Sequence, residues 1–154
     1  MVLSMQSKKI RIFINGFGRI GRSAARIILE EKSLELVGIN DLYSYEQMVY
    51  LLKYDSSYGM LEHTISVKED RLFIDDKTIK LFSEYDPENM NMNDLNVDVV
   101  LQCSGMFLTT GSNLPLIKNG ARKVIISAPA TDDTPTYIFG VNNKEYQQES
   151  VISN

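Results

Sequence analysis

Three glycines near the N-terminus have the spacing of a loop that binds a dinucleotide. They follow the apolar run of residues 10–14 and stand as Gly16-x-Gly18-x-x-Gly21, directly before a helix-like pattern. In such a loop the first glycine allows a tight turn off the strand, the second lets the backbone approach a pyrophosphate, and the third lets the helix pack closely. The N–H groups and positive dipole end of the helix then face the diphosphate. The spacing therefore predicts a dinucleotide cradle.

An acidic residue stands where the ribose of such a cofactor is bound. A second apolar run, residues 34–39, ends in Asn40-Asp41, and Asp41 follows Gly21 by about 20 residues. A carboxylate there accepts hydrogen bonds from both ribose hydroxyls and repels a 2′-phosphate, so it favours NAD over NADP. The alternative, that the glycines only form a turn, is weaker because strand, helix and acid all agree.

Two later apolar runs end in residues that extend this site. Residues 97–101 lead to Cys103-Ser104-Gly105, and residues 123–126 lead to Ser127. Ligands of open α/β sheets lie beyond the carboxyl ends of the strands, at the switch between the two halves. Ser104 and Gly105 are thus expected to face the middle of the cofactor and Ser127 its nicotinamide end. The alternative is that Ser104 and Gly105 merely turn the chain.

The elements that must position these residues alternate between strands and helices. Apolar runs predict strands over residues 10–14, 34–39, 97–101, 123–126, 137–141 and 151–152, and helical patterns cover residues 20–31, 45–54 and 114–119. Short alternating segments over residues 64–82 predict two antiparallel hairpins. The sequence therefore predicts an α/β fold, a Rossmann-type mostly parallel sheet flanked by helices, with a small antiparallel insertion.

Some side chains are assigned to a face by pattern alone. The helix over residues 20–31 places Ile20, Ala24, Ile27 and Ile28 on one face, with Arg26 and Glu30 on its exposed side. The Asn-rich segment 86–96 is expected to be a loop or frayed turn, with Met90 and Met92 exposed.

Composition excludes several functional classes. The chain has 154 residues, 44% hydrophobic and 23% charged, which fits one domain with a real core. A net charge of −4 argues against nucleic acid or an anionic membrane as a partner. No apolar run is long enough to span a membrane, and residues 1–7 lack the core of a signal peptide. A single cysteine fits a reducing cytoplasm.

The remaining reactive side chains do not form a catalytic centre. Cys103 closes a buried strand and is expected to be a small core residue, not a nucleophile. His63 is the only histidine and is expected at the surface, neither a metal ligand nor a general base. Without a Cys/His cluster we predict no metal. The chain thus has a cofactor cradle and no visible catalytic apparatus.

Several motifs resemble one enzyme family. They are residues 14–22, Asn40-Asp41-Leu42, residues 52–56, Ser127-Ala128-Pro129, residues 140–142 and the closing residues 151–154. Together they resemble phosphorylating glyceraldehyde-3-phosphate dehydrogenase over essentially the whole chain. The resemblance implies that residues 1–154 are its NAD-binding domain and that the catalytic domain is absent. The catalytic cysteine would follow Asn154 within a few residues and its histidine later, so this chain alone is expected to be inactive.

The resemblance also assigns site residues. It implies that Arg19 and Ile20 contact the diphosphate through backbone N–H groups, that Asp41 holds the adenosine ribose, and that Tyr85 lies in a loop near the adenine. Tyr85 stands where an arginine is common, and Gln102 stands where an acid is more usual. The predicted cofactor-binding set is Asn15, Gly16, Phe17, Gly18, Arg19, Ile20, Gly21, Asp41, Tyr85, Ser104, Gly105 and Ser127.

For the intact enzyme, the resemblance implies glycolytic oxidation of a triose phosphate to an acyl phosphate, with hydride passing to NAD. It also implies a cytoplasmic homotetramer. Two alternatives stay open: the NAD domain of an erythrose-4-phosphate dehydrogenase, and a non-catalytic nucleotide-binding module. Absence of a second domain from the coding sequence supports the module; a cysteine motif after Asn154 supports the enzyme.

Overall fold

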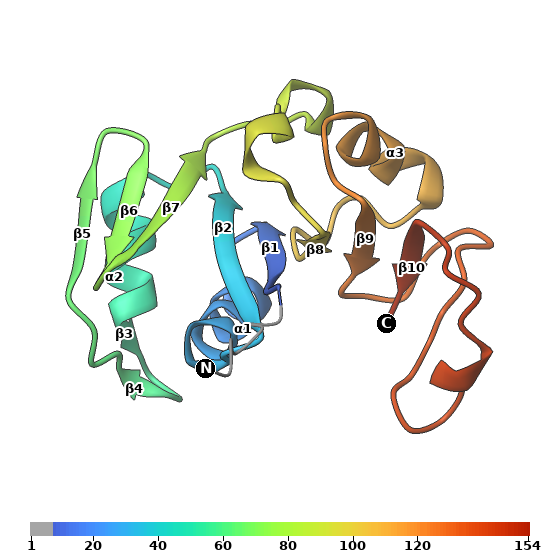
Figure 1. The fold of residues 1–154 in the computed structure, drawn as a ribbon, viewed down its shortest axis with the longest axis horizontal. Helices are drawn as coiled ribbons and strands as arrows, with labels where there is room; N and C mark the ends of the chain where they lie inside the picture. The colour runs from blue at the N-terminus through green and yellow to red at the C-terminus, as the bar shows by residue number, and fades with distance from the viewer. Residues whose placement is uncertain (1–7) are drawn as a thin grey trace, which may run out of the picture.

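A computed structural model describes residues 8–154, and an eight-stranded sheet runs through the whole of this part (Figure 1). The expected absence of a signal peptide concerns residues 1–7, which lie outside the described residues. The strands of the large sheet are β1 (Ile10–Asn15), β2 (Leu34–Asn40), β5 (Ile65–Lys68), β6 (Arg71–Ile74), β7 (Lys77–Phe82), β8 (Val99–Gln102), β9 (Lys123–Ile126) and β10 (Val151–Ser153). The helices are α1 (Arg19–Glu30), α2 (Tyr45–Lys53) and α3 (Thr110–Lys118).

The strand order is β10-β9-β8-β1-β2-β7-β6-β5, and every neighbouring pair from β10 to β7 is parallel. Its six parallel strands have the order of the doubly wound, Rossmann-type fold, with the switch point between β1 and β8. The predicted fold class is confirmed. The antiparallel insertion is also present, as β5 and β6, but its last strand, β7, pairs with β2 and belongs to the parallel sheet.

Each face of the sheet has its own apolar core. Ile12 and Ile14 of β1 pack with residues of α1 and α2, such as Ala25 and Leu52. Phe13, between them, points to the other face and packs in a cluster that includes Leu116 of α3. Because successive side chains of a strand alternate between faces, a continuous apolar run is what a strand buried on both sides requires.

The buried face of α1 differs from the expected one by one residue. Gly21, Ala25, Ile28 and Leu29 are buried, whereas Ile20 and Ile27 are 58% and 67% exposed. The cause is the contact at the start of the helix: a Cβ at residue 21 would lie 2.1 Å from the Gly16 carbonyl oxygen. This backbone contact turns the line of residues through Gly21 toward the sheet.

Of the two residues expected on the exposed side of α1, Glu30 is exposed and Arg26 is only partly so. The Arg26 guanidinium donates to the carbonyls of Leu52 (2.7 Å) and Gly59 (2.9 Å), at the end of α2 and in a small second sheet. That sheet pairs β3 (Tyr54–Asp55) with β4 (Gly59–Met60).

Met90 and Met92, expected to be exposed, are both fully buried. They follow the 3-10 turn Pro87–Asn89 and pack into the core beneath α3. The Asn119 side chain holds this segment down, because its amide donates to the Pro87 (3.0 Å) and Glu88 (2.8 Å) carbonyls. The prediction of exposure was wrong because Asn119, which is distant in sequence, holds the turn against the core and buries the two methionines with it.

Two other predicted elements have different bounds or are missing. Helix α3 begins at Thr110 and not at residue 114, because Thr109 and Ser112 form a capping box. Residues 137–141 are not a strand. Thr136 makes one isolated bridge to Ser153, and the Asn142 side chain then accepts from the Ile138 N–H (2.7 Å), which turns the segment away from the sheet. A 3-10 turn, Asn143–Glu145, follows.

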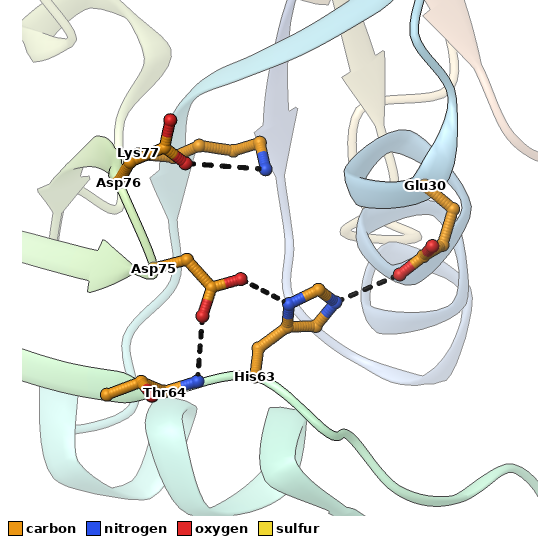
Figure 2. Close-up of polar contacts among 6 residues, drawn as sticks. All are labelled: Glu30, His63, Thr64, Asp75, Asp76 and Lys77. Atoms are coloured by element: carbon orange, nitrogen blue, oxygen red, sulfur yellow. Dashed lines mark hydrogen bonds and ion pairs between the residues drawn. The ribbon is translucent and has the colours of Figure 1, made fainter.

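His63 ties the antiparallel hairpin to α1. Its Nδ1 lies 2.6 Å from Asp75 Oδ2, in the turn between β6 and β7, and its Nε2 lies 2.9 Å from Glu30 Oε1, at the end of α1 (Figure 2). Asp75 Oδ1 also accepts from the Thr64 N–H. The imidazole was expected at the surface but is only 19% exposed. Only an imidazolium can donate to both carboxylates, because neutral histidine has one N–H.

Stability should therefore depend on the protonation of His63. Hydrogen bonds to Asp75 and then Glu30 raise the pKa of His63, so its stabilising contribution is complete below the ordinary histidine value of about 6.5 and is lost as pH rises through the folded-state value. The hydrogen bond from His63 lowers the pKa of Asp75, so the carboxylate's contribution is lost only in acid. Urea unfolding from pH 5 to 9 should show that the free energy of unfolding of the chain exceeds that of His63→Gln at low pH and that this difference shrinks as pH rises. A difference that stays constant over this pH range contradicts the linkage.

Candidate cofactor site

The turn from β1 into α1 is built on two backbone contacts that no side chain permits. Gly16 has a φ of +94°, and a Cβ there would lie 2.4 Å from the Ser104 nitrogen. A Cβ on Gly21 would collide with the Gly16 carbonyl. Gly18 is different: its φ is −72° and no atom lies within 4 Å of an added Cβ. The fold requires the first and third glycines, whereas the second borders open space.

The N-terminus of α1 is open to an anion. The N-cap residue, Gly18, makes no side-chain cap and the first turn has no acidic residue. The first N–H groups of a helix have no intrahelical acceptor and carry the positive end of its dipole. The backbone of Arg19, Ile20 and Gly21 therefore has the donors that a diphosphate needs. Arg22 Nη1 donates to the Phe17 carbonyl (3.0 Å) and braces the loop.

Asp41, just past the end of β2, is held by two backbone groups. Its Oδ2 accepts from the Phe17 N–H (2.5 Å) and its Oδ1 from the Tyr43 N–H (3.1 Å). These bonds fix the carboxylate next to the glycine loop. An ionised carboxylate has about four lone-pair sites, so acceptors remain for two hydroxyl groups.

A hollow of about 420 Å³ lies over the carboxyl ends of β1, β2 and β8. Two other hollows are larger, one of about 490 Å³ beside α1 and one of about 530 Å³ on the face of β2 and β7 opposite α1, so size does not single this one out. Its position does, because ligands of doubly wound sheets bind at this edge. Of the predicted residues, it brings together Asn15, Gly16, Gly18, Asp41, Tyr85 and Ser104.

The other predicted residues lie outside this hollow. The Phe17 side chain is 1% exposed and packs in the core, so only its backbone takes part. Arg19, Ile20 and Gly21 border the loop through their backbone. Gly105 is exposed beyond Ser104. Ser127 follows β9, and its Oγ donates to the Gln102 carbonyl (3.1 Å), farther along the same edge of the sheet.

Seven residues that line the hollow were not in the predicted set: Asn40, Leu42, Tyr43, Glu84, Cys103, Met106 and Phe107. All come within a few positions of a strand end. Tyr43 and Met106 are 48% and 56% exposed. The apolar ones among them could have been found from the sequence, because they stand just after a predicted strand.

Cys103 shows no sign of activation. Burial raises the pKa of its thiol, against a smaller lowering by a hydrogen bond with Ser127. It packs partly buried against the core, which favours the structural interpretation. Within residues 8–154 no three Cys, His, Asp or Glu side chains gather as a metal site, and no helix there is long and apolar enough to cross a bilayer.

Comparison with known proteins leads to the same fold and cofactor. The family described as "Glyceraldehyde 3-phosphate dehydrogenase, NAD binding domain" matches residues 10–110. The chain is 44% identical over 145 residues to the cytosolic glyceraldehyde-3-phosphate dehydrogenase of Trypanosoma brucei brucei, covering 94% of this chain and 44% of that protein. It is 47% identical over 144 residues to the glyceraldehyde-3-phosphate dehydrogenase of Clostridium acetobutylicum, and this match covers 93% of this chain and 43% of that protein. It thus spans less than half the length of these relatives.

The strand order, the glycine turn, the open helix terminus and the carboxylate past β2 define a Rossmann-type domain that binds NAD. The match over residues 10–110 shows which one: the chain belongs to the family of glyceraldehyde-3-phosphate dehydrogenase NAD-binding domains.

Replacing Gly16 should damage the fold itself. Gly16→Ala forces a left-handed residue to carry a Cβ into the Ser104 backbone, so the free energy of unfolding should fall by about 3 kcal/mol. Gly111→Ala in α3 is the matched control, since an added Cβ there meets nothing within 4 Å and its stability should be unchanged or slightly higher. Urea unfolding checks both, and equal stabilities contradict the role given to Gly16.

Proposed function

We propose that this chain is the NAD-binding part of a phosphorylating glyceraldehyde-3-phosphate dehydrogenase, which oxidises a triose phosphate aldehyde to an acyl phosphate. The observation that carries the proposal is that the uncapped N-terminus of α1 and the Asp41 carboxylate border one hollow at the switch point. The names of relatives 40–47% identical to the chain favour this substrate over erythrose 4-phosphate.

Each part of the site has a binding role in this proposal. Backbone N–H groups of Arg19 and Ile20 hold the diphosphate. Asp41 accepts from the hydroxyls of the adenosine ribose, and the hollow between Tyr85 and Ser104 receives the adenosine half. The nicotinamide half extends past Gly105 toward Ser127, which lies outside that hollow.

When bound, NAD supplies the hydride acceptor. The residues described here bind and orient it, and none of them is suited to attack an aldehyde, since burial raises the pKa of the Cys103 thiol. We therefore assign the nucleophilic cysteine and its histidine partner to a catalytic domain outside this chain. The length of the relatives, more than twice the matched segment, supports this division.

We also propose that the intact enzyme is a homotetramer of the cytoplasm that does not bind nucleic acid. The name of the trypanosomal relative includes the word cytosolic, and the net charge of −4 disfavours a polyanionic partner.

Changing Asp41 should alter the choice of cofactor. Asp41→Ala removes an acceptor and a repulsive charge, so NAD should bind about tenfold more weakly and the preference over NADP should narrow. Asp41→Asn keeps the size and one acceptor, so it should lose less NAD affinity while still binding NADP better than the original chain does. Calorimetric titration with each cofactor measures both ratios. If the ratio of NAD affinity to NADP affinity is unchanged in both variants, Asp41 does not bind the ribose.

Gly18 separates binding from folding. Because nothing lies within 4 Å of an added Cβ and its φ is ordinary, Gly18→Ala should leave the free energy of unfolding within about 0.5 kcal/mol. The methyl group would stand in front of the α1 terminus, where a diphosphate must approach the backbone, so NAD affinity should fall about tenfold or more. Calorimetry and urea unfolding test the pair of results. Unchanged affinity contradicts this location of the diphosphate.

A further inference from the structure

Four buried side-chain amides form a continuous hydrogen-bonded line beneath the hollow. Asn40 Nδ2 donates to Asn15 Oδ1 (2.8 Å), Asn15 Nδ2 to Gln102 Oε1 (3.0 Å), and Gln102 Nε2 to Asn113 Oδ1 (3.0 Å). They stand on β2, β1, β8 and α3, and none is more than 3% exposed. The line therefore crosses the sheet at the switch point.

Both ends of the line hold backbone segments that border the hollow. At one end, Asn40 accepts from the Glu84 N–H (2.8 Å) and donates to the Glu84 carbonyl (2.9 Å). At the other, Asn113 Nδ2 donates to the carbonyls of Phe107 and Thr109, both at 2.8 Å. Midway, the Ser104 hydroxyl donates to Gln102 Oε1 (2.8 Å).

These two segments form the flanks of the hollow. Glu84 and Tyr85 follow β7, and residues 104–107 follow β8, and β2 and β1 separate those strands in the sheet. These two segments are the walls of the hollow, and they follow different strands. The distance between the walls therefore depends on the contacts that connect them, and the line of amides is one such connection.

The line has only one internally consistent orientation. The Glu84 N–H requires an acceptor at Asn40 Oδ1, and the Phe107 and Thr109 carbonyls require a donor at Asn113. Every amide between them must then donate in the same direction. Turning Gln102 over would oppose like atoms on both sides, and unsatisfied polar groups are costly in a buried site.

We propose that Gln102 and Asn113 are positioning residues for the cofactor: through Asn15 and Asn40 they set the spacing between the two walls that receive the adenosine half. This inference rests on the proposed function. Neither residue touches the ligand in this scheme; Asn113 is fully buried on α3 and acts through the backbone of residues 107–109.

Three probes distinguish positioning from general support of the fold. Gln102→Met keeps the length of the side chain and removes both of its polar groups. NAD and AMP both fill the adenosine half, so each should bind about tenfold more weakly. Inorganic diphosphate needs only the α1 terminus, so its binding, followed by NMR at the amides of residues 18–21, should be unchanged. Equal losses for all three, or no loss for any, overturn the proposal.

Asn113→Ala interrupts the line of amides at a second place. It should also weaken NAD and AMP binding and leave diphosphate binding unchanged, so the test remains valid if Gln102→Met does not fold. Asn142→Ala is the matched control. Its side chain also joins two backbone groups, the Ile138 N–H and the Thr136 carbonyl, in a loop away from the hollow. It should bind all three probes like the original chain.

A ligand-free measurement separates this inference from the proposed function. Hydrogen exchange at the Glu84 N–H should accelerate in Gln102→Met, although Asn15 and Asn40 lie between them. If the exchange rate is unchanged, the line of amides does not connect Gln102 to Glu84, and the inference is overturned whatever the chain binds. If exchange accelerates but the chain binds neither NAD nor AMP, the proposed function and the role of the line in cofactor binding are both overturned. The line would then only support the fold.

Discussion

The contact between the Gly16 backbone and two neighbouring backbones controls most of what surrounds the site. On one side Gly16 lies against the Ser104 nitrogen, and on the other its carbonyl lies against Gly21, so closely that a Cβ at residue 16 or 21 would collide. The first contact joins β1 to β8 across the switch point. The second fixes the rotation of α1 about its axis. The direction in which the first N–H groups of α1 point is therefore set by packing before any ligand arrives.

The strands and the glycine turn could be predicted from the sequence, whereas the buried face of α1 could not. Continuous apolar runs identified the central strands, because a strand buried on both faces needs apolar residues at every position. The spacing of Gly16, Gly18 and Gly21 identified the turn. Hydrophobic periodicity then chose the wrong face of α1 by one residue, because the deciding contact is made by a glycine. A residue without a side chain carries no weight in such a pattern.

Other differences arise from side-chain amides that bind the backbone far along the chain. Met90 and Met92 lie among asparagines, which suggest exposure, yet Asn119 and the turn at residues 87–89 close the segment over the core. The amides of the line from Asn40 to Asn113 likewise have no local pattern. Their partners lie 11 to 87 residues away in sequence, so only the folded arrangement reveals them.

The charges around the hollow decide how an anionic cofactor is held. Among its described lining residues, Asp41 and Glu84 are acidic and none is Lys or Arg. In the proposed function a diphosphate would therefore depend on backbone N–H groups, which bind through fixed dipoles without a formal positive charge. A second phosphate on the adenosine ribose would meet a carboxylate and no cation. With neutral donors proposed for the diphosphate and a carboxylate proposed for the ribose, we expect the site to accept NAD and to disfavour NADP.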